Sequence, residues 1–152
     1  MKKKTEEGSN PQHGIHIINP AELGAPSGYS NGVKAHGSLL AISGQIAWDH
    51  EHQIVSDNLT EQFAQALGNF VTVVRAAGGQ PENVIQMRLF VTDTREYTSQ
   101  LKPIGEAYRQ HMGHHYPAMT LVEVKGLLEN RAKIEIEGLA VIPEKRTGRS
   151  AK

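Results

Sequence analysis

The chain has 152 residues, enough for one ordinary domain, and its formal net charge at pH 7 is zero. Hydrophobic residues make up 38% and charged residues 21%, a soluble globular composition, and no apolar run reaches the roughly 18 residues that a membrane-spanning helix requires. The absence of cysteine excludes disulfides, thiolate metal sites and a thiol nucleophile. No apolar stretch follows the N-terminal lysines, so we expect no secretory signal and a cytoplasmic protein.

The charged residues are distributed unevenly. Residues 1–7 and 144–152 contain seven Lys or Arg and three Glu, which leaves nine basic and thirteen acidic residues between them. The body of the chain therefore carries a net charge of about −4, a poor match for a phosphate backbone, and this argues against a nucleic-acid partner. We expect a flexible N-terminal tail over 1–14, a single domain over 15–143 and a basic C-terminal tail over 144–152.

The first half of the predicted domain contains a loop, two strands and a helix. Residues 19–32 are rich in turn formers and predict an ordered loop before a strand over 32–36. The segment 39–46 alternates as a strand does, and Gly44 within it indicates a bulge or a close backbone approach. Asp57, Asn58 or Thr60 can cap a helix to residue 77, whose apolar residues recur mostly at spacings of three and four.

The second half continues with a strand, a helix and two more strands. Residues 84–91 alternate cleanly, and a second helix covers 95–113, where Pro103 suits a first turn and allows 94–101 to be a separate turn. Strands over 118–125 and 133–141 complete the order β-β-α-β-α-β-β. This order predicts an α/β domain with one sheet covered by two helices.

The predicted sheet has one aliphatic face and one mixed face. The mixed face combines polar residues with three apolar ones: Gln45, Gln86, Arg88, Glu123, Glu135 and Glu137 with Phe90, Leu121 and Leu139. Such a face is either half solvated or packed on another subunit. The mid-strand glutamates favour a wet interface or a cleft over a dry core.

From Gly28 to Ile142 the chain resembles the RidA/YjgF family of small imine deaminases, also called the L-PSP endoribonuclease family. The resemblance rests on short collinear motifs: Gly28-Tyr29, Ser43-Gly44-Gln45, Gln62, Asn69, Ala76-Ala77-Gly78, Phe90-Val91, Asp93, Tyr108, Pro117-Ala118, Val122-Glu123-Val124 and Lys133-Ile134-Glu135-Ile136-Glu137. It implies a chorismate-mutase-like fold with a mixed sheet and a homotrimer with three clefts between subunits.

The resemblance also implies the catalytic residues. In active members a tyrosine of the first loop lines the site, a glutamate of the last strand positions water against the imine carbon, and an arginine after the Pro-Ala pair holds the substrate carboxylate. By position, the tyrosine is Tyr29 and the glutamate is Glu135, whereas the arginine position holds Met119, followed two residues later by Leu121. Methionine has neither the charge nor the planar donors of arginine, and losing such a contact in a desolvated cleft costs about 2–5 kcal/mol of binding. We therefore predict a small-molecule substrate other than a 2-imino acid.

The remaining predicted substrate-binding residues are Arg88, Phe90 and Gly44. Arg88 shares the mixed face with Glu135 and Phe90, so it could anchor an anionic ligand in place of the missing arginine; the alternative is an ion pair with Glu123 or Glu137.

The eight histidines do not form a catalytic zinc pattern. His111 and His115 are four residues apart but lack a nearby carboxylate in the required spacing, and His50 and His52 flank Glu51 in a predicted loop. Surface histidines are the simpler interpretation, and we expect no metal and no cofactor.

Three functions remain open. The first is an imine or enamine deaminase that uses Glu135 and Tyr29 at clefts between subunits. The second is a catalytically silent protein that binds a small molecule or a protein partner. The third is an endoribonuclease, which the acidic body and the single tryptophan argue against.

Overall fold

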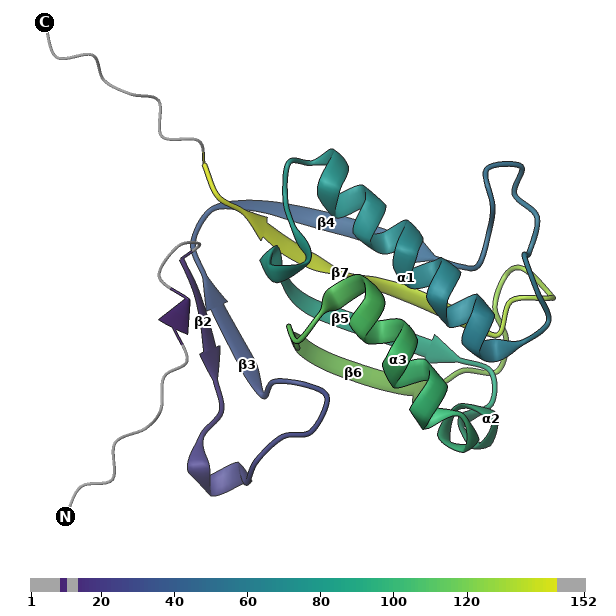
Figure 1. Ribbon diagram of the computed structural model, residues 1–152, viewed down its shortest axis with the longest axis horizontal. Coiled ribbons are helices and arrows are strands. Elements are labelled where there is room, and N and C mark those ends of the chain that lie inside the picture. Colours follow the sequence, from purple (N-terminus) through teal and green to yellow (C-terminus); the bar gives the residue numbers. More distant parts are fainter. Residues whose placement is uncertain (1–8, 11–13, 145–152) are drawn as a thin grey trace, which may run out of the picture.

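The computed structural model of the chain describes residues 9–10 and 14–144 (Figure 1). The predicted C-terminal tail lies outside the described residues except for Glu144, as does most of the predicted N-terminal tail. Within the described part, no helix is long and apolar enough to cross a membrane.

A mixed four-stranded sheet is the centre of the fold. Its strand order is β4 (Ser38–Gln45), β7 (Ile134–Ile142), β5 (Val84–Val91) and β6 (Ala118–Glu123), with β5 and β6 parallel and the other pairs antiparallel. The helices α1 (Leu59–Ala76) and α3 (Leu101–Met112) cover one face of this sheet, and the short helix α2 (Thr94–Ser99) lies at its end (Figure 1). The predicted α/β fold is confirmed, and the predicted second helix is divided at residue 100, as Pro103 allowed.

The helix α1 follows from its sequence pattern. Asn58 caps it by accepting a hydrogen bond from the backbone N–H of Glu61 at 3.0 Å. Its buried face includes Phe63, Leu67 and Phe70, each at most 1% exposed, and these side chains fill the space between helix and sheet. Burying three such side chains contributes several kcal/mol, at about 1.5–3 kcal/mol each.

A second, smaller sheet lies beside the first. It consists of β1 (Ser9–Asn10), β2 (Ile15–Ile18) and β3 (Gly32–Ala35), all antiparallel. The predicted strand 32–36 therefore forms as β3, but it pairs with β2 instead of joining the main sheet. The strand β2 was not predicted, because four residues are too few to show a periodicity. Two single-turn 3-10 helices, Ala21–Leu23 and Pro81–Asn83, complete the described elements.

The register of β6 changes the predicted assignment of faces. Met119 and Leu121 lie opposite Met87 and Leu89 of β5, so they share the helix-covered side of the sheet. The prediction that Leu121 and Glu123 belong to the mixed face was wrong. Both sets of alternating residues in this strand contain apolar side chains, so the alternation does not tell which set faces the helices.

Irregularities in pairing shift the register of two other strands, β5 and β4. In β5 the register shifts between Val84 and Gln86, so Val84 is fully buried while Ile85 is only half-buried. In β4 it shifts between Ile42 and Gln45, as expected for the position of Gly44. The uncovered face of the sheet exposes apolar side chains, including Leu39 at 67% and Val122 at 42%.

Candidate functional site

A hollow lies where β4 ends and β7 begins. It has a volume of about 670 Å³ and is lined by residues 43–46 and 48, His52, Asn69 of α1, residues 127–129 and Glu135 of β7. We call it the Glu135 hollow.

Glu135 lies directly across the backbone of Gly44. A Cβ atom at position 44 would overlap Glu135 Oε1 and would lie 2.6 Å from its Cδ, so only glycine leaves room for this carboxylate. Glu135 also lies opposite Phe90 in the antiparallel pair of β7 and β5, which places the two side chains next to each other. Three of the predicted site residues are thus brought together: Glu135, Gly44 and Phe90.

The helix α1 fixes the loop that forms one wall of the hollow. Asn69 Nδ2 donates to the carbonyl oxygens of Ile46 and Trp48 at 3.0 and 2.9 Å. Gln65 Nε2 donates to the same Trp48 oxygen at 3.1 Å and to Asn69 Oδ1 at 3.0 Å. Asn69 therefore shapes the hollow indirectly, because its side-chain amide binds the backbone of the segment that carries Trp48.

A buried glutamine fixes the start of the strand that carries Glu135. Gln62 is 0% exposed, and its Nε2 donates to the carbonyl oxygens of Ser56 at 2.8 Å and Arg131 at 2.9 Å. Its Oε1 accepts the backbone N–H of Lys133 at 2.8 Å. The Gln62 side chain thus joins α1 to the segment before this helix and to the segment that leads into β7. Its contact with Lys133 lies two residues before Glu135.

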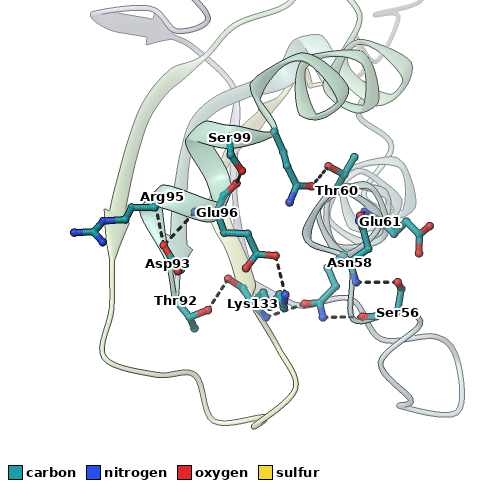
Figure 2. A network of polar contacts seen from close by, with 12 residues as sticks. Ser56, Asn58, Thr60, Glu61, Thr92, Asp93, Arg95, Glu96, Ser99 and Lys133 are labelled. Carbon is teal, nitrogen blue, oxygen red and sulfur yellow. Dashed lines mark hydrogen bonds and ion pairs between the residues drawn. The ribbon is translucent and has the colours of Figure 1, made fainter.

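A polar network extends this anchor to α2 and α3 (Figure 2). Lys133 Nζ forms an ion pair with Glu96 Oε1 at 2.7 Å, and Asp93 caps α2 by accepting the backbone N–H of Glu96 at 3.1 Å. Thr60 Oγ1 donates to Gln100 Oε1 at 2.6 Å, which joins α1 to the start of α3. The first residues of α1, α2 and β7 are therefore held as one unit.

Tyr29 lies in a different and smaller hollow. This Tyr29 hollow has a volume of about 220 Å³ and is lined by six residues: Gly28, Tyr29, Leu89, Tyr97, Met119 and Leu121. Ser30 places Tyr29 there, because its N–H donates to Pro117 O at 2.9 Å and its hydroxyl donates to Tyr116 O. Burial raises the pKa of Tyr97 above its usual value, so its phenol stays neutral.

Arg88 lines neither of these two hollows. Its Nη1 forms an ion pair with Glu137 Oε1 at 2.8 Å, and its Nη2 donates to Gln86 Oε1 at 3.3 Å. This is one of the two pairings that the sequence left open. The predicted set therefore divides into Glu135, Gly44 and Phe90 in one place, and Tyr29, Met119 and Leu121 in another.

Several residues of the Glu135 hollow were missed in the sequence. From the sequence, His52 is a predicted surface histidine and Trp48 counts only as the single tryptophan, while the two leucines 127–128 carry no prediction. They come from two loops that are far apart in sequence, and neither loop carries a recognisable motif. A left-handed backbone at His52, with φ of 56°, is the only local sign of a special position, and it is visible only in the structure.

The loop of His52 is organised by Asp49. Its Oδ1 accepts the backbone N–H groups of Gln53 and Glu51, both at 2.9 Å, and the hydrogen bond from Gln53 holds the pKa of Asp49 below its usual value. Among residues 9–10 and 14–144, no three His, Cys, Asp or Glu side chains gather as a metal site would require.

Comparisons with known proteins place the chain in a family. The family model described as Endoribonuclease L-PSP matches residues 20–142. The human 2-iminobutanoate/2-iminopropanoate deaminase is 31% identical over 127 residues, which cover 82% of this chain and 88% of that protein. The protein of the same name from Salmonella typhimurium is 33% identical over 122 residues, with 80% and 91% covered.

Solved structures show the same fold. The Rid family protein YyfB from Yersinia pestis superposes with a TM-score of 0.76 at 29% identity, covering 85% of this chain and 99% of that chain. Escherichia coli TdcF with bound serine gives a TM-score of 0.61 at 32% identity, covering 78% and 91%. The match over residues 20–142 and these relatives establish that the chain belongs to the RidA/YjgF family.

Proposed function

We propose that the protein is an imine or enamine deaminase and that Glu135 is its water-positioning residue. The observation that carries this proposal is the placement of the Glu135 carboxylate, which is half-buried, lines the Glu135 hollow and lies over a glycine that leaves it room. The names of the human and Salmonella relatives, both 2-iminobutanoate/2-iminopropanoate deaminases, support the same reaction class.

The chemistry requires one carboxylate and one water molecule. Glu135 accepts a proton from the water as the water oxygen attacks the imine carbon, and it passes this proton to the imine nitrogen, which gives a carbinolamine. The hydroxyl proton of the carbinolamine then moves through Glu135 to the nitrogen as the C–N bond breaks and the C=O bond forms, so the products are a carbonyl compound and ammonia. Positioned proton transfer of this kind contributes about 10²–10⁴-fold to a rate.

We further propose that the working unit is a homotrimer and that each cleft joins the Glu135 hollow of one copy to the Tyr29 hollow of the next. Within one copy the two predicted catalytic residues line separate hollows, so a single chain does not offer them to one substrate. The uncovered sheet face, with Leu39 and Val122 exposed, offers the apolar surface for such an assembly. Light scattering should then give about 50 kDa, three times the chain mass of 16.7 kDa.

Met119 supports a substrate other than a 2-imino acid. It lies in the Tyr29 hollow without a charged neighbour among the described lining residues, so nothing there pairs with a carboxylate. Arg88 as a replacement anchor stays a prediction, and its ion pair with Glu137 would have to open for that purpose.

The test is ammonia release from imines generated in place by an oxidase, using wild type, Glu135→Gln and Tyr29→Ala. We expect each variant alone to lose about 10²-fold or more of the activity while it stays folded. Mixed assembly of the two variants should restore about a quarter of the clefts, since each cleft needs one intact residue from each of two chains.

The outcomes separate the open functions. Full activity in Glu135→Gln would refute the proposed mechanism, and failure of the mixed sample to regain activity would refute the shared cleft. Saturable binding of small molecules without any turnover would identify a silent binding protein. RNA cleavage that survives purification and disappears in Glu135→Gln would favour the endoribonuclease.

A further inference from the structure

The Glu135 hollow has an aromatic wall that the proposed reaction does not use. The rings of Trp48 and His52 lie against each other in a tilted arrangement, with their centroids 4.8 Å apart and an interplanar angle of 34°. Both residues line the hollow, with Leu127 and Leu128 as further apolar lining. Trp48 is the only tryptophan of the chain.

The backbone holds this wall in place. Two side chains of α1 bind the carbonyl oxygen of Trp48, and Trp48 forms a β-bridge with Ile54 on the returning side of the loop. His52 N–H donates to Asp49 O at 3.1 Å, and the backbone of His52 is left-handed, with its ring beside that of Trp48. A wall fixed by backbone contacts can recognise a flat group without first being ordered, which reduces the entropy cost of binding.

The charge of the hollow is one-sided. Its acidic lining residues are Glu129 and Glu135, and none of the described residues that line either hollow is Lys or Arg. Glu129 is half-buried and its Oε1 accepts the backbone N–H of Arg131 at 3.2 Å, so this carboxylate is held at the rim. A carboxylate on the ligand would face two like charges, whereas a protonated imine would face two opposite ones.

We infer that the Glu135 hollow selects imines that carry an aromatic group and no carboxylate, as formed by oxidation of an arylalkylamine. The Trp48–His52 wall would stack on the aromatic ring, and the two glutamates would face the imine nitrogen. This inference rests on the proposed deaminase function. The reaction is R–CH=NH + H2O → R–CHO + NH3, and an amine oxidase that releases its imine must supply the substrate.

The binding part of the inference can be tested apart from turnover. Excitation of Trp48, the single tryptophan, reports directly on ligands at this wall. Wild-type protein is titrated with 2-phenylethylamine, which has the ring and a positive nitrogen, and with 3-phenylpropionate, which has the ring and a carboxylate. We expect a saturable change with the amine and a Kd at least about tenfold lower than that for the acid.

Three variants test which residues are responsible for the binding of the amine. His52→Asn removes the ring and keeps a residue that tolerates the left-handed backbone, so it should weaken the binding of the amine about fivefold. His50→Asn is the matched control, because His50 lies in the same loop with its side chain 90% exposed and outside the hollow; it should change nothing. Glu129→Gln keeps the acceptor for Arg131 and should reduce the preference for the amine over the acid about fivefold.

Turnover is then compared for imines generated by oxidases from 2-phenylethylamine, phenylalanine and alanine. The imines from 2-phenylethylamine and phenylalanine differ only in the carboxylate, and those from phenylalanine and alanine differ only in the ring. We expect the imine from 2-phenylethylamine to be hydrolysed with a higher kcat/KM than either of the other two. Equal or better binding of 3-phenylpropionate, or equal effects of His50→Asn and His52→Asn, would overturn the inference. Hydrolysis of the alanine-derived imine alone would overturn it and leave the deaminase proposal standing, whereas failure to hydrolyse any imine would refute the deaminase proposal as well.

Discussion

Gly44→Ala is a substitution whose effect on function and on stability can be predicted separately. The added methyl carbon would overlap Glu135 Oε1 and lie 2.6 Å from Cδ and 2.9 Å from Cγ of the same side chain. Carbon atoms in ordinary contact are about 3.5–4.0 Å apart, so the Glu135 side chain must move by about 1 Å or more. The atoms it displaces belong to the end of a flexible side chain, and the backbone around position 44 can stay where it is.

The cost to folding is therefore small. A displaced rotamer costs about 0.5–1.5 kcal/mol, and replacing glycine within a strand returns about 0.5–1 kcal/mol. We expect the free energy of unfolding to change by less than about 1 kcal/mol, which corresponds to about 2–4 °C in Tm for a chain of this size.

The cost to activity is large. A catalytic group misplaced by about 1 Å can lose about 10²-fold in rate, so kcat/KM of Gly44→Ala for the best imine substrate should fall by about that factor. Ammonia release measures the activity, and thermal unfolding measures the stability. Gly126→Ala is the matched control, since a Cβ there meets no atom within 4 Å, and it should leave both values unchanged. Unchanged activity in Gly44→Ala would show that the carboxylate position over Gly44 is unrelated to catalysis.

Two further predictions concern stability. Gln62→Met keeps the side-chain length but leaves three backbone groups without their partner, so urea unfolding should show a loss of about 3 kcal/mol or more; a loss below about 1 kcal/mol would refute the anchoring of β7 by this residue. Tyr108 is buried and donates to His115 O at 2.6 Å, and burial raises its pKa above the usual value of about 10. As the pH rises, the unfolded chain therefore loses this proton before the folded chain does, and the free energy of unfolding falls above about pH 10. Tyr108→Phe should flatten this decrease with pH and should cost about 1 kcal/mol of stability at pH 7.

Much of the fold could be predicted from local patterns. The strand 84–91 coincides with β5, α1 begins after its Asn58 cap, and the split of the second helix follows from Pro103. These features depend on side chains within a few positions of each other, which is the range over which periodicity and capping act. Gly44 was also recognised as a place of close approach, although the group that approaches it could not be named.

The candidate site was predicted only in part for a physical reason. Glu135, Gly44 and Phe90 are 45 to 91 positions apart in the chain and meet because β7 pairs with both β4 and β5. A family motif can mark such residues one at a time, but the wall of Trp48 and His52 belongs to no motif and depends on how one loop is held by α1.

By itself, the sequence determined most of the helices and strands, their order and the family, because alternation, helical spacing and short motifs depend on residues that are close together in the chain. Only the tertiary structure decided which face of β6 meets the helices, that β3 pairs with β2, and that Tyr29 and Glu135 occupy separate hollows. Each of these depends on strand register and loop placement, which are set by contacts between residues far apart in the chain, and the local pattern is compatible with either arrangement.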